Sequence, residues 1–170
     1  MTSIPHPDSE PIAVRCAAIT VSDTRTPDTD RSGRIVRTRL VEAGHAIAAY
    51  EILKDDPVAI RDLLMTLASR DDLDAIVFNG GTGIAPRDTT YDAIASLLEK
   101  TLPGFGEIFR SLSYHEIGSR AIASRAIAGV YHSKLIFSIP GSTGAVSLAL
   151  ERLILPELVH LVSQLTRSPA

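Results

Sequence analysis

The sequence predicts a three-layer α/β/α sandwich around a mostly parallel sheet of about four to six strands. Two observations lead to this prediction: short apolar runs alternate with segments of helical periodicity, and aliphatic residues dominate over a 5% aromatic content. Parallel strands that are covered by helices on both faces have this aliphatic composition. The length of 170 residues fits one domain. We expect residues 13–166 to form it and the polar residues 1–12 to be a flexible leader.

The first half of the chain alternates regularly between the two kinds of element. Period-2 and continuous apolar runs predict strands, and 3.6-residue periodicity predicts helices. The expected elements are strands at 14–22, 46–53 and 75–79, and helices at about 33–43 and 57–68. Gly44 ends the first helix, while Asp56 and Pro57 provide an N-cap and a first-turn proline for the second. Two crossover units are therefore expected before residue 80.

The second half continues the alternation with more interruptions. The expected elements are helices from Thr89 or Thr90 to Lys100, at 105–117 and from after Gly144 to about 165, with strands at 126–131 and 134–139. Pro103 and Gly104 break the pattern, and Pro156 is a candidate interruption of the last helix. His132 and Ser133 form a short connection between the two strands.

Charge and composition exclude several classes of function. The net charge is −3 and the basic residues are scattered, so no nucleic-acid groove is expected. The apolar runs are far shorter than the roughly 20 residues that cross a bilayer. Cys16 is the single cysteine, which predicts a buried residue in a reducing cytoplasm. The five histidines lack zinc-site spacing, and no GxSxG elbow is present.

Polar and glycine-rich segments follow four of the predicted strands. Because the carboxyl ends of parallel strands meet at one edge of the sheet, these segments should share a crest, where ligands of such folds bind. The segments are Ser22-Asp23-Thr24, Lys54-Asp55-Asp56, Gly80 to Asp88, and Pro140-Gly141-Ser142-Thr143. Hydroxyls, carboxylates and glycines in one place favour a site for phosphate and a metal ion.

The loop of Gly80, Gly81, Thr82 and Gly83 is the sharpest of these features. Glycines let backbone N–H groups approach an anion closely, and the following helix adds the positive end of its dipole. The loop is neither a Walker A motif nor a dinucleotide fingerprint, because GK[ST] and GxGxxG are both absent from it. A tight turn without a ligand remains the alternative.

The carboxylates near this loop also allow two interpretations. Asp55 and Asp88 could hold Mg²⁺ between them, since that ion takes one or two carboxylates together with phosphate oxygens and water. Alternatively, Asp55 caps a helix, and Asp88 pairs with Arg87 or begins the next helix. Ser22, Asp23 and Ser142 are equally ambiguous, because these residue types also form turns and helix caps.

The motifs taken together resemble the MoaB/Mog family. The resemblance runs from about Val14 to Leu158. It rests on ITVSDTR with DRSG, NGGTGIAPRDTTYDAI, PGFGEIFRSLSYHEIGSRAIASRAIAG and LIFSIPGSTGAV, in this order and spacing. The SYHEIGSR segment is closer to the MoaB branch. Asn79 stands where a threonine is frequent in the family, and Lys54 where a proline often precedes the acid.

The resemblance implies molybdopterin adenylyltransferase activity with ATP and Mg²⁺, in a homotrimer or homohexamer. By position, it assigns Asp55 and Asp88 as the catalytic and metal-binding acids and the 80–83 loop as the phosphate cradle. The implied substrate-binding residues are Ser22, Asp23, Ser124, Arg125, Gly141 and Ser142. A molybdopterin phosphate oxygen would then attack the α-phosphorus of ATP and release pyrophosphate, with no covalent enzyme intermediate.

Two further hypotheses remain open from the sequence. The chain could bind or carry molybdopterin without catalysis, which the residues at 54 and 79 motivate. It could also be a regulatory or structural oligomer that uses the apolar stripe of the 105–117 helix.

Overall fold

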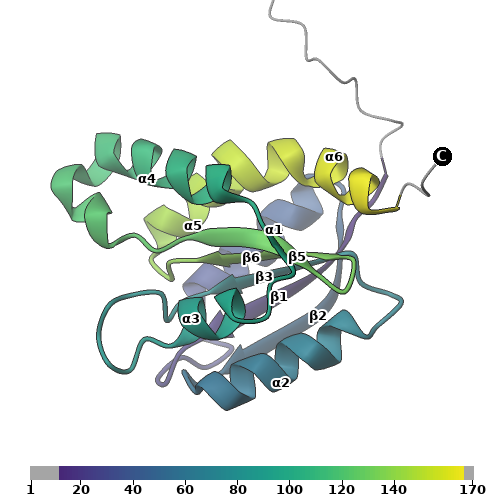
Figure 1. Cartoon of the computed structure of the whole chain (residues 1–170), viewed down its shortest axis with the longest axis horizontal. Coiled ribbons are helices and arrows are strands. Elements are labelled where there is room, and N and C mark those ends of the chain that lie inside the picture. Colours follow the sequence, from purple (N-terminus) through teal and green to yellow (C-terminus); the bar gives the residue numbers. More distant parts are fainter. Residues whose placement is uncertain (1–11, 167–170) are drawn as a thin grey trace, which may run out of the picture.

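The computed structural model describes residues 12–166, which form one six-stranded sheet with helices on both faces (Figure 1). The strands follow the order β2-β1-β3-β6-β5-β4 across the sheet. Their bounds are β1 Arg15–Val21, β2 Ala46–Leu53, β3 Ala75–Asn79, β4 Lys100–Thr101, β5 Ile127–Tyr131 and β6 Lys134–Ile139. The predicted α/β sandwich is confirmed. The expected leader falls, apart from residue 12, outside the described residues.

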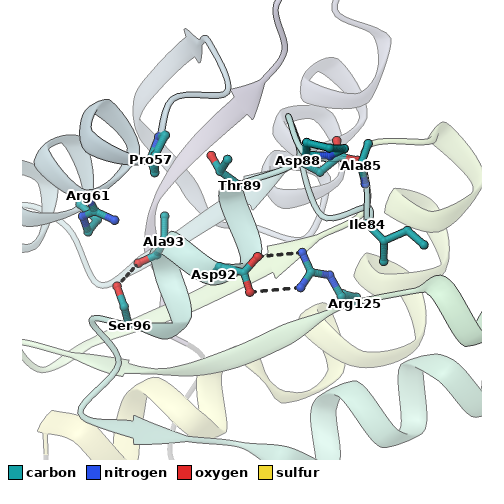
Figure 2. A pocket seen from close by; sticks show the side chains of 11 residues that line it. Pro57, Arg61, Ile84, Ala85, Asp88, Thr89, Asp92, Ala93, Ser96 and Arg125 are labelled. Atoms are coloured by element: carbon teal, nitrogen blue, oxygen red, sulfur yellow. Dashed lines mark hydrogen bonds and ion pairs between the residues drawn. The ribbon is translucent and has the colours of Figure 1, made fainter.

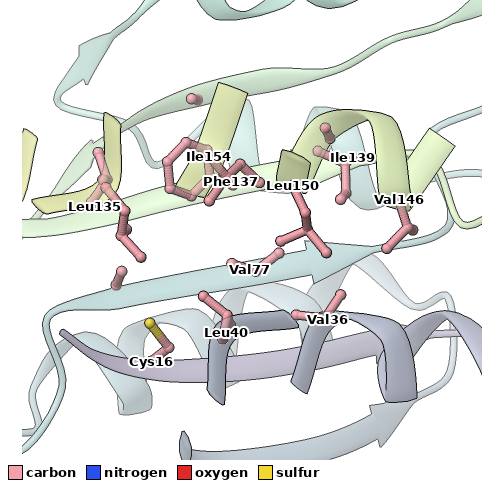
Figure 3. Close-up of a cluster of buried hydrophobic side chains, with 14 of the residues drawn as sticks. Cys16, Val36, Leu40, Val77, Leu135, Phe137, Ile139, Val146, Leu150 and Ile154 are labelled. Carbon is pink, nitrogen blue, oxygen red and sulfur yellow. The ribbon is translucent and has the colours of Figure 1, made fainter. Parts of the chain in front are cut away.

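The helices divide between the two faces of the sheet. Their bounds are α1 Arg31–Glu42, α2 Pro57–Ala68, α3 Thr90–Ala95, α4 Pro103–Ile117, η1 Gly118–Ala123, α5 Thr143–Ala149, η2 Leu150–Ile154 and α6 Leu155–Thr166. One core cluster lies under α1, α4, α5 and α6, and Figure 3 shows Val36, Leu40, Phe137 and Leu150 within it. The second cluster lies under α2 and α3 (Figure 1). Among residues 12–166, no helix is long and apolar enough to span a membrane.

Of the six strands in residues 12–166, five run in one direction and β5 runs opposite to them. Strands β2, β1, β3 and β6 run in one direction, while β5 pairs antiparallel with both β6 and β4. The hairpin between β5 and β6 is closed by His132 and Ser133, whose φ angles are 46° and 58°. A two-residue hairpin with positive φ at both positions matches the twist of the strands. The sheet is thus mostly parallel, as predicted.

The segment after α3 differs from the sequence prediction. The helix expected to reach Lys100 ends at Ala95, and Lys100–Thr101 forms the edge strand β4. The backbone explains this, because Glu99 N–H donates to Val130 O at 2.9 Å and Leu102 N–H donates to Ala128 O at 2.8 Å. Pairing with β5 therefore outcompetes the helical continuation in this segment.

Pro103 acts differently from expectation, whereas Pro156 acts close to it. Pro103 begins α4 instead of ending a pattern, in the first turn where its missing N–H costs nothing. The last helix is irregular at Leu150–Ile154, one turn before Pro156, where it has π-helical hydrogen bonding. A wider turn directly before a proline accommodates the ring and the missing donor. The predicted interruption is therefore present, slightly earlier in the chain.

Candidate functional site

The site lies where the winding of the sheet changes direction. The chain passes from β1 to β2 on one side and then returns to β3 on the other side of β1. The carboxyl ends of β1 and β3 therefore flank the switch point, which is the usual ligand crevice of such sheets. Gly80 follows β3 with φ of 103°, and a Cβ there would lie 2.2 Å from Val21 O at the end of β1. Only glycine fits this close approach.

Asp55 follows β2 and joins the glycine-loop region to the rest of the crest. Its Oδ1 accepts hydrogen bonds from Thr89 N at 3.0 Å and from Thr89 Oγ1 at 2.6 Å. Its own N–H donates to Asp23 Oδ1 at 3.1 Å. Asp55 thus holds the start of α3 with one carboxylate oxygen. The sequence left open that Asp55 only caps a helix, and this oxygen does contact a helix start, that of α3 and not that of α2. Asp56 caps α2, as predicted.

The second oxygen of Asp55 lies beside Gly81. A Cβ on Gly81 would be 2.2 Å from Asp55 Oδ2 and 2.1 Å from Thr90 Oγ1, and φ there is 64°. The Thr90 hydroxyl is buried and has no hydrogen-bond partner in the described part of the chain. The absence of a side chain on Gly81 leaves a small cradle beside these two oxygen atoms. A carboxylate oxygen and a hydroxyl oxygen are ligand types that fit Mg²⁺.

Asp88 folds back over its own loop. Its Oδ2 accepts a hydrogen bond from Ala85 N at 3.1 Å, and a Cβ on Gly83 would be 2.4 Å from the same oxygen. Arg87 pairs with Asp23 at 2.9 Å, which is a different partner from the one weighed in the sequence. Within residues 12–166 no cluster of three or more His, Cys, Asp or Glu could hold a metal by itself. Any Mg²⁺ here would need phosphate or water oxygens as well.

Ser22 and Asp23 lie at the end of β1 and shape the turn that follows it. Ser22 Oγ accepts hydrogen bonds from Thr24 N at 3.3 Å and Arg25 N at 3.2 Å. Asp23 uses one oxygen for the Asp55 N–H and the other for Arg87. Ser22 therefore forms a turn, which was one of the two interpretations of the sequence. Asp23 connects the ends of β1 and β2 to the 80–88 loop.

The second glycine loop packs directly on the first. A Cβ on Gly141 would lie 2.9 Å from Gly80 Cα. Ser142 caps α5 by accepting a hydrogen bond from Ala145 N at 3.3 Å. Ser124 ends η1, and the neighbouring Arg125 reaches the first loop by donating to Thr82 O and Gly83 O. The structure thus brings the segments of all predicted site residues to one crest.

Two hollows at the crest each include a hydrogen-bond partner of Asp55. The first has a volume of about 500 Å³ and lies between the 80–88 loop, α2 and α3 (Figure 2). It is lined by Asp88, Thr89, Asp92, Arg125, Arg61 and Ile84, among others. The second, of about 520 Å³, is lined by Ser22, Asp23, Arg25, Tyr50 and Lys54, among others. Both volumes suit a small-molecule ligand. Asp55 contacts Thr89 of the first hollow and Asp23 of the second.

A buried carboxylate behind the crest was missed by the sequence reasoning. Asp30, fully buried, caps α1 by accepting from Gly33 N at 2.9 Å, and it also accepts from Thr20 Oγ1 at 2.7 Å and Tyr50 OH at 2.8 Å. Burial opposes its ionisation, but these hydrogen bonds hold the pKa of Asp30 below its usual value. Asn79 Nδ2 in turn donates to Thr20 Oγ1 at 3.1 Å. The network thereby supports the residue that precedes Gly80.

A signal for this network was present in the DRSG motif. Aspartate is a preferred N-cap residue, and its side chain accepts from the N–H three positions later. Reading Asp30 as an N-cap predicts a helix that begins at Arg31, where α1 starts. A Cβ on Gly33 would lie 2.0 Å from Asp30 Oδ2, so the glycine is required by the buried acid. The partners Thr20 and Tyr50 come from two other strands and could not be read from local sequence.

The fold and crest together define a doubly wound α/β domain with glycine loops, hydroxyls and carboxylates at its switch point. Residues 17–160 match the family model described as "Probable molybdopterin binding domain". The chain therefore belongs to this family, in agreement with the MoaB/Mog motifs. Membership places it among proteins of molybdenum cofactor biosynthesis.

Curated relatives and solved structures agree with this assignment. The chain is 54% identical over 163 residues to "Molybdenum cofactor biosynthesis protein B" of Halalkalibacterium halodurans, covering 95% of this chain and 96% of the relative. The same values hold for the protein of that name from Bacillus subtilis. A crystal structure of a molybdenum cofactor biosynthesis protein B has a TM-score of 0.91 and 49% identity, covering 94% of this chain and 100% of that one.

A tungsten-pathway structure is also similar. The tungsten cofactor synthesizing protein MoaB from Pyrococcus furiosus superposes with a TM-score of 0.83 and is 33% identical, over 92% of this chain and 99% of that chain.

Proposed function

We propose that this chain catalyses the Mg·ATP-dependent adenylylation of molybdopterin. The observation that carries the proposal is the position of Asp55, which is hydrogen-bonded to Thr89 of the first hollow and to Asp23 of the second. A reaction between two bound substrates needs two adjoining pockets with negative charge neutralised between them. Asp55 Oδ2, beside the unpaired Thr90 hydroxyl, is the group on this chain suited to hold a cation there.

The residues of the chain would mainly position the reactants. Asp55 and Asp88 would hold Mg²⁺, which supplies charge neutralisation on the phosphate oxygens. The backbone of the 80–83 loop would bind the phosphates of ATP, because its glycines leave the N–H groups accessible. The attacking group is the phosphate of molybdopterin, which is already ionised, so no basic side chain has to remove a proton. This agrees with the lack of a histidine among the residues that line the two hollows.

The direct test incubates the protein with molybdopterin, ATP and Mg²⁺ and detects adenylylated product by mass spectrometry. We expect product with the natural sequence, and at least a 100-fold slower rate for Asp88→Asn, the loss typical of removing one transition-state stabilising group. Asp62→Asn, at an exposed position of α2, is the matched control and should react normally. An unchanged rate in Asp88→Asn would refute the role of that acid.

The same experiment distinguishes the carrier hypothesis. A carrier would bind molybdopterin tightly in a calorimetric titration while showing neither Mg·ATP binding nor product. The hydrogen bonds that Asp55 and Asp88 already make within the crest are compatible with that outcome, since they leave each acid a structural role. Product formation by the natural sequence would exclude it.

We also propose that the chain assembles into a homotrimer or homohexamer. The support is a group of large apolar side chains exposed on α4 and η1, which include Ile108 at 51%, Tyr114 at 60% and Ile122 at 85% of their full exposure. Exposed apolar groups of this kind mark interaction surfaces. Light scattering coupled to size exclusion tests the proposal, and a monomeric mass would contradict it.

A further inference from the structure

Arg125 uses its guanidinium group to hold the backbone of the glycine loop. Its Nε donates to Thr82 O at 3.1 Å and its Nη2 donates to Gly83 O at 2.9 Å. These are two consecutive peptide carbonyls of the loop, and Arg125 lies 42 to 43 residues further along the chain. No other arginine side chain in residues 12–166 donates to two consecutive carbonyls of a glycine loop.

The guanidinium group is itself fixed from two other directions. Nη1 and Nη2 donate to the two carboxylate oxygens of Asp92 at 3.1 Å and 2.9 Å (Figure 2). Its carbon lies 4.7 Å from the centre of the Tyr91 ring. Bidentate pairing and stacking are the two contacts that use the planar shape of arginine, which lysine lacks. Arg125 is therefore a rigid support, and its charge is already matched by Asp92.

Because Arg125 fixes the direction of two peptide carbonyls, it also fixes the direction of the N–H groups in the same peptide units. In a trans peptide, the C=O and the N–H point in opposite directions. Because Thr82 O and Gly83 O face Arg125, the N–H groups of Gly83 and Ile84 face away from it. Within residues 12–166, neither of these N–H groups donates to a protein atom. They are two aligned donors available to an anion.

We propose that Arg125 is a positioning residue that orients the N–H groups of Gly83 and Ile84 toward the polyphosphate of a nucleoside triphosphate. It acts through the backbone and does not contact the nucleotide itself. The inference rests on the proposed function, in which this loop binds the phosphates of ATP. It differs from the substrate-contact role that the sequence motif implies for Arg125.

The chain offers a matched control at Arg70. Arg70 also makes a bidentate pair with an aspartate, Asp72, at 2.8 Å and 2.7 Å, and it donates to the backbone oxygen of Ala48 at 3.1 Å. Its side chain is 35% exposed, against 27% for Arg125. The two arginines thus share partner types and exposure, but only Arg125 reaches the loop.

The experiment compares Arg125→Gln and Arg125→Lys with Arg70→Gln and Arg70→Lys. Steady-state kinetics give separate KM values for ATP and molybdopterin, and hydrogen exchange with the nucleotide-free protein measures protection in the loop. Arg125→Gln removes the charged hydrogen bonds that orient the two N–H donors, so we expect it to raise the KM for ATP at least about 10-fold. The KM for molybdopterin should stay within about 2-fold. The hydrogen-bonded amides of Ala85, Asp88 and Thr90 around the loop should exchange faster, and the Arg70 variants should match the natural protein.

Arg125→Lys separates positioning from charge. Lysine keeps the positive charge but cannot span two carbonyls and a carboxylate. We expect it to behave like Arg125→Gln in both readouts. Full recovery by lysine, a rise confined to the KM for molybdopterin, or loop exchange equal to that of the Arg70 variants would each overturn the proposal. If the natural protein does not bind ATP, the proposed function fails, but loop exchange in the nucleotide-free variants still decides the role of Arg125.

Discussion

Oδ1 of Asp55 accepts two hydrogen bonds from a single residue, Thr89, through its backbone N–H at 3.0 Å and its hydroxyl at 2.6 Å. Asp55 follows β2 and Thr89 directly precedes α3, so a residue 34 positions earlier in the chain caps the helix that follows the glycine loop. One carboxylate oxygen is thereby occupied by the fold. The other remains beside Gly81, where a ligand could use it.

Because Oδ1 of Asp55 binds Thr89 and Oδ2 faces Gly81, a substitution at position 55 should affect the stability and the activity to different extents. Asp55→Asn keeps a carbonyl oxygen that can accept from Thr89, so the free energy of unfolding should fall by no more than about 1 kcal/mol. The loss of negative charge should slow adenylylation at least about 100-fold. Urea unfolding and product formation measure the two effects.

Thr89→Ala is the complementary variant, because it removes the hydroxyl that binds Asp55 and leaves the carboxylate in place. It should lower the free energy of unfolding by about 1 kcal/mol, as for the loss of one hydrogen bond. Its effect on the rate should be much smaller than that of Asp55→Asn. Equal rate losses in the two variants would contradict the assignment of Oδ2 to a cation.

Gly81→Ala should disrupt the cradle directly. The added methyl would meet Asp55 Oδ2 at 2.2 Å and Thr90 Oγ1 at 2.1 Å, in a left-handed backbone conformation with φ of 64°. We expect a loss of about 1–3 kcal/mol in stability and near-complete loss of activity. Gly104→Ala in α4 is the control, because an added methyl there meets nothing within 4 Å. A Gly81→Ala protein with normal activity would exclude a ligand in the cradle.

The buried Asp30 should make the protein sensitive to acid. Its pKa is lowered in the folded state, since hydrogen bonds outweigh the opposing effect of burial. Its stabilisation is therefore complete above the unfolded pKa of about 3.9 and is lost as the pH falls through the folded value. Asp30→Asn should cost about 1–3 kcal/mol at pH 7, and the difference from the natural protein should shrink below about pH 4. Asp28→Asn, at an exposed position of the same loop, should change neither value.

His45 should produce a second pH dependence, near neutrality. Burial lowers the pKa of His45, and its Nδ1 accepts a hydrogen bond from Val14 N at 3.2 Å. When the pH falls below about 6.5, the unfolded chain binds a proton at this residue before the folded one does. The free energy of unfolding should therefore decline between pH 7 and pH 5, and less so in His45→Gln. His115→Gln, at an exposed position of α4, is the control and should keep the natural pH dependence.

The sequence was informative wherever local periodicity and parallel topology determine the structure. Strand β2 was predicted with its observed bounds, and α2 was predicted from its cap and first-turn proline. The helix expected up to Lys100 was wrong in its second half, because pairing of residues 99–102 with β5 is a long-range interaction. Such pairing overrides local helical preference, and no local pattern announces it.

The candidate site was predictable in outline for a related reason. Parallel strands bring their carboxyl ends together, so the crest with Ser22, Asp55, Gly80 and Gly141 could be inferred from the order of elements. The individual hydrogen bonds could not. The partners of Asp55 and Arg125 come from distant segments, and only the packed structure decides which oxygen meets which donor.

The contact between Gly80 and Gly141 has a consequence for how this protein matures. These residues belong to loops that follow β3 and β6, and their backbones touch because neither carries a side chain. During synthesis, the crevice cannot close until β6 has docked against β3. A nascent or truncated product that ends before β6 would carry the complete GGTG motif but would lack the Gly141 loop that packs on it.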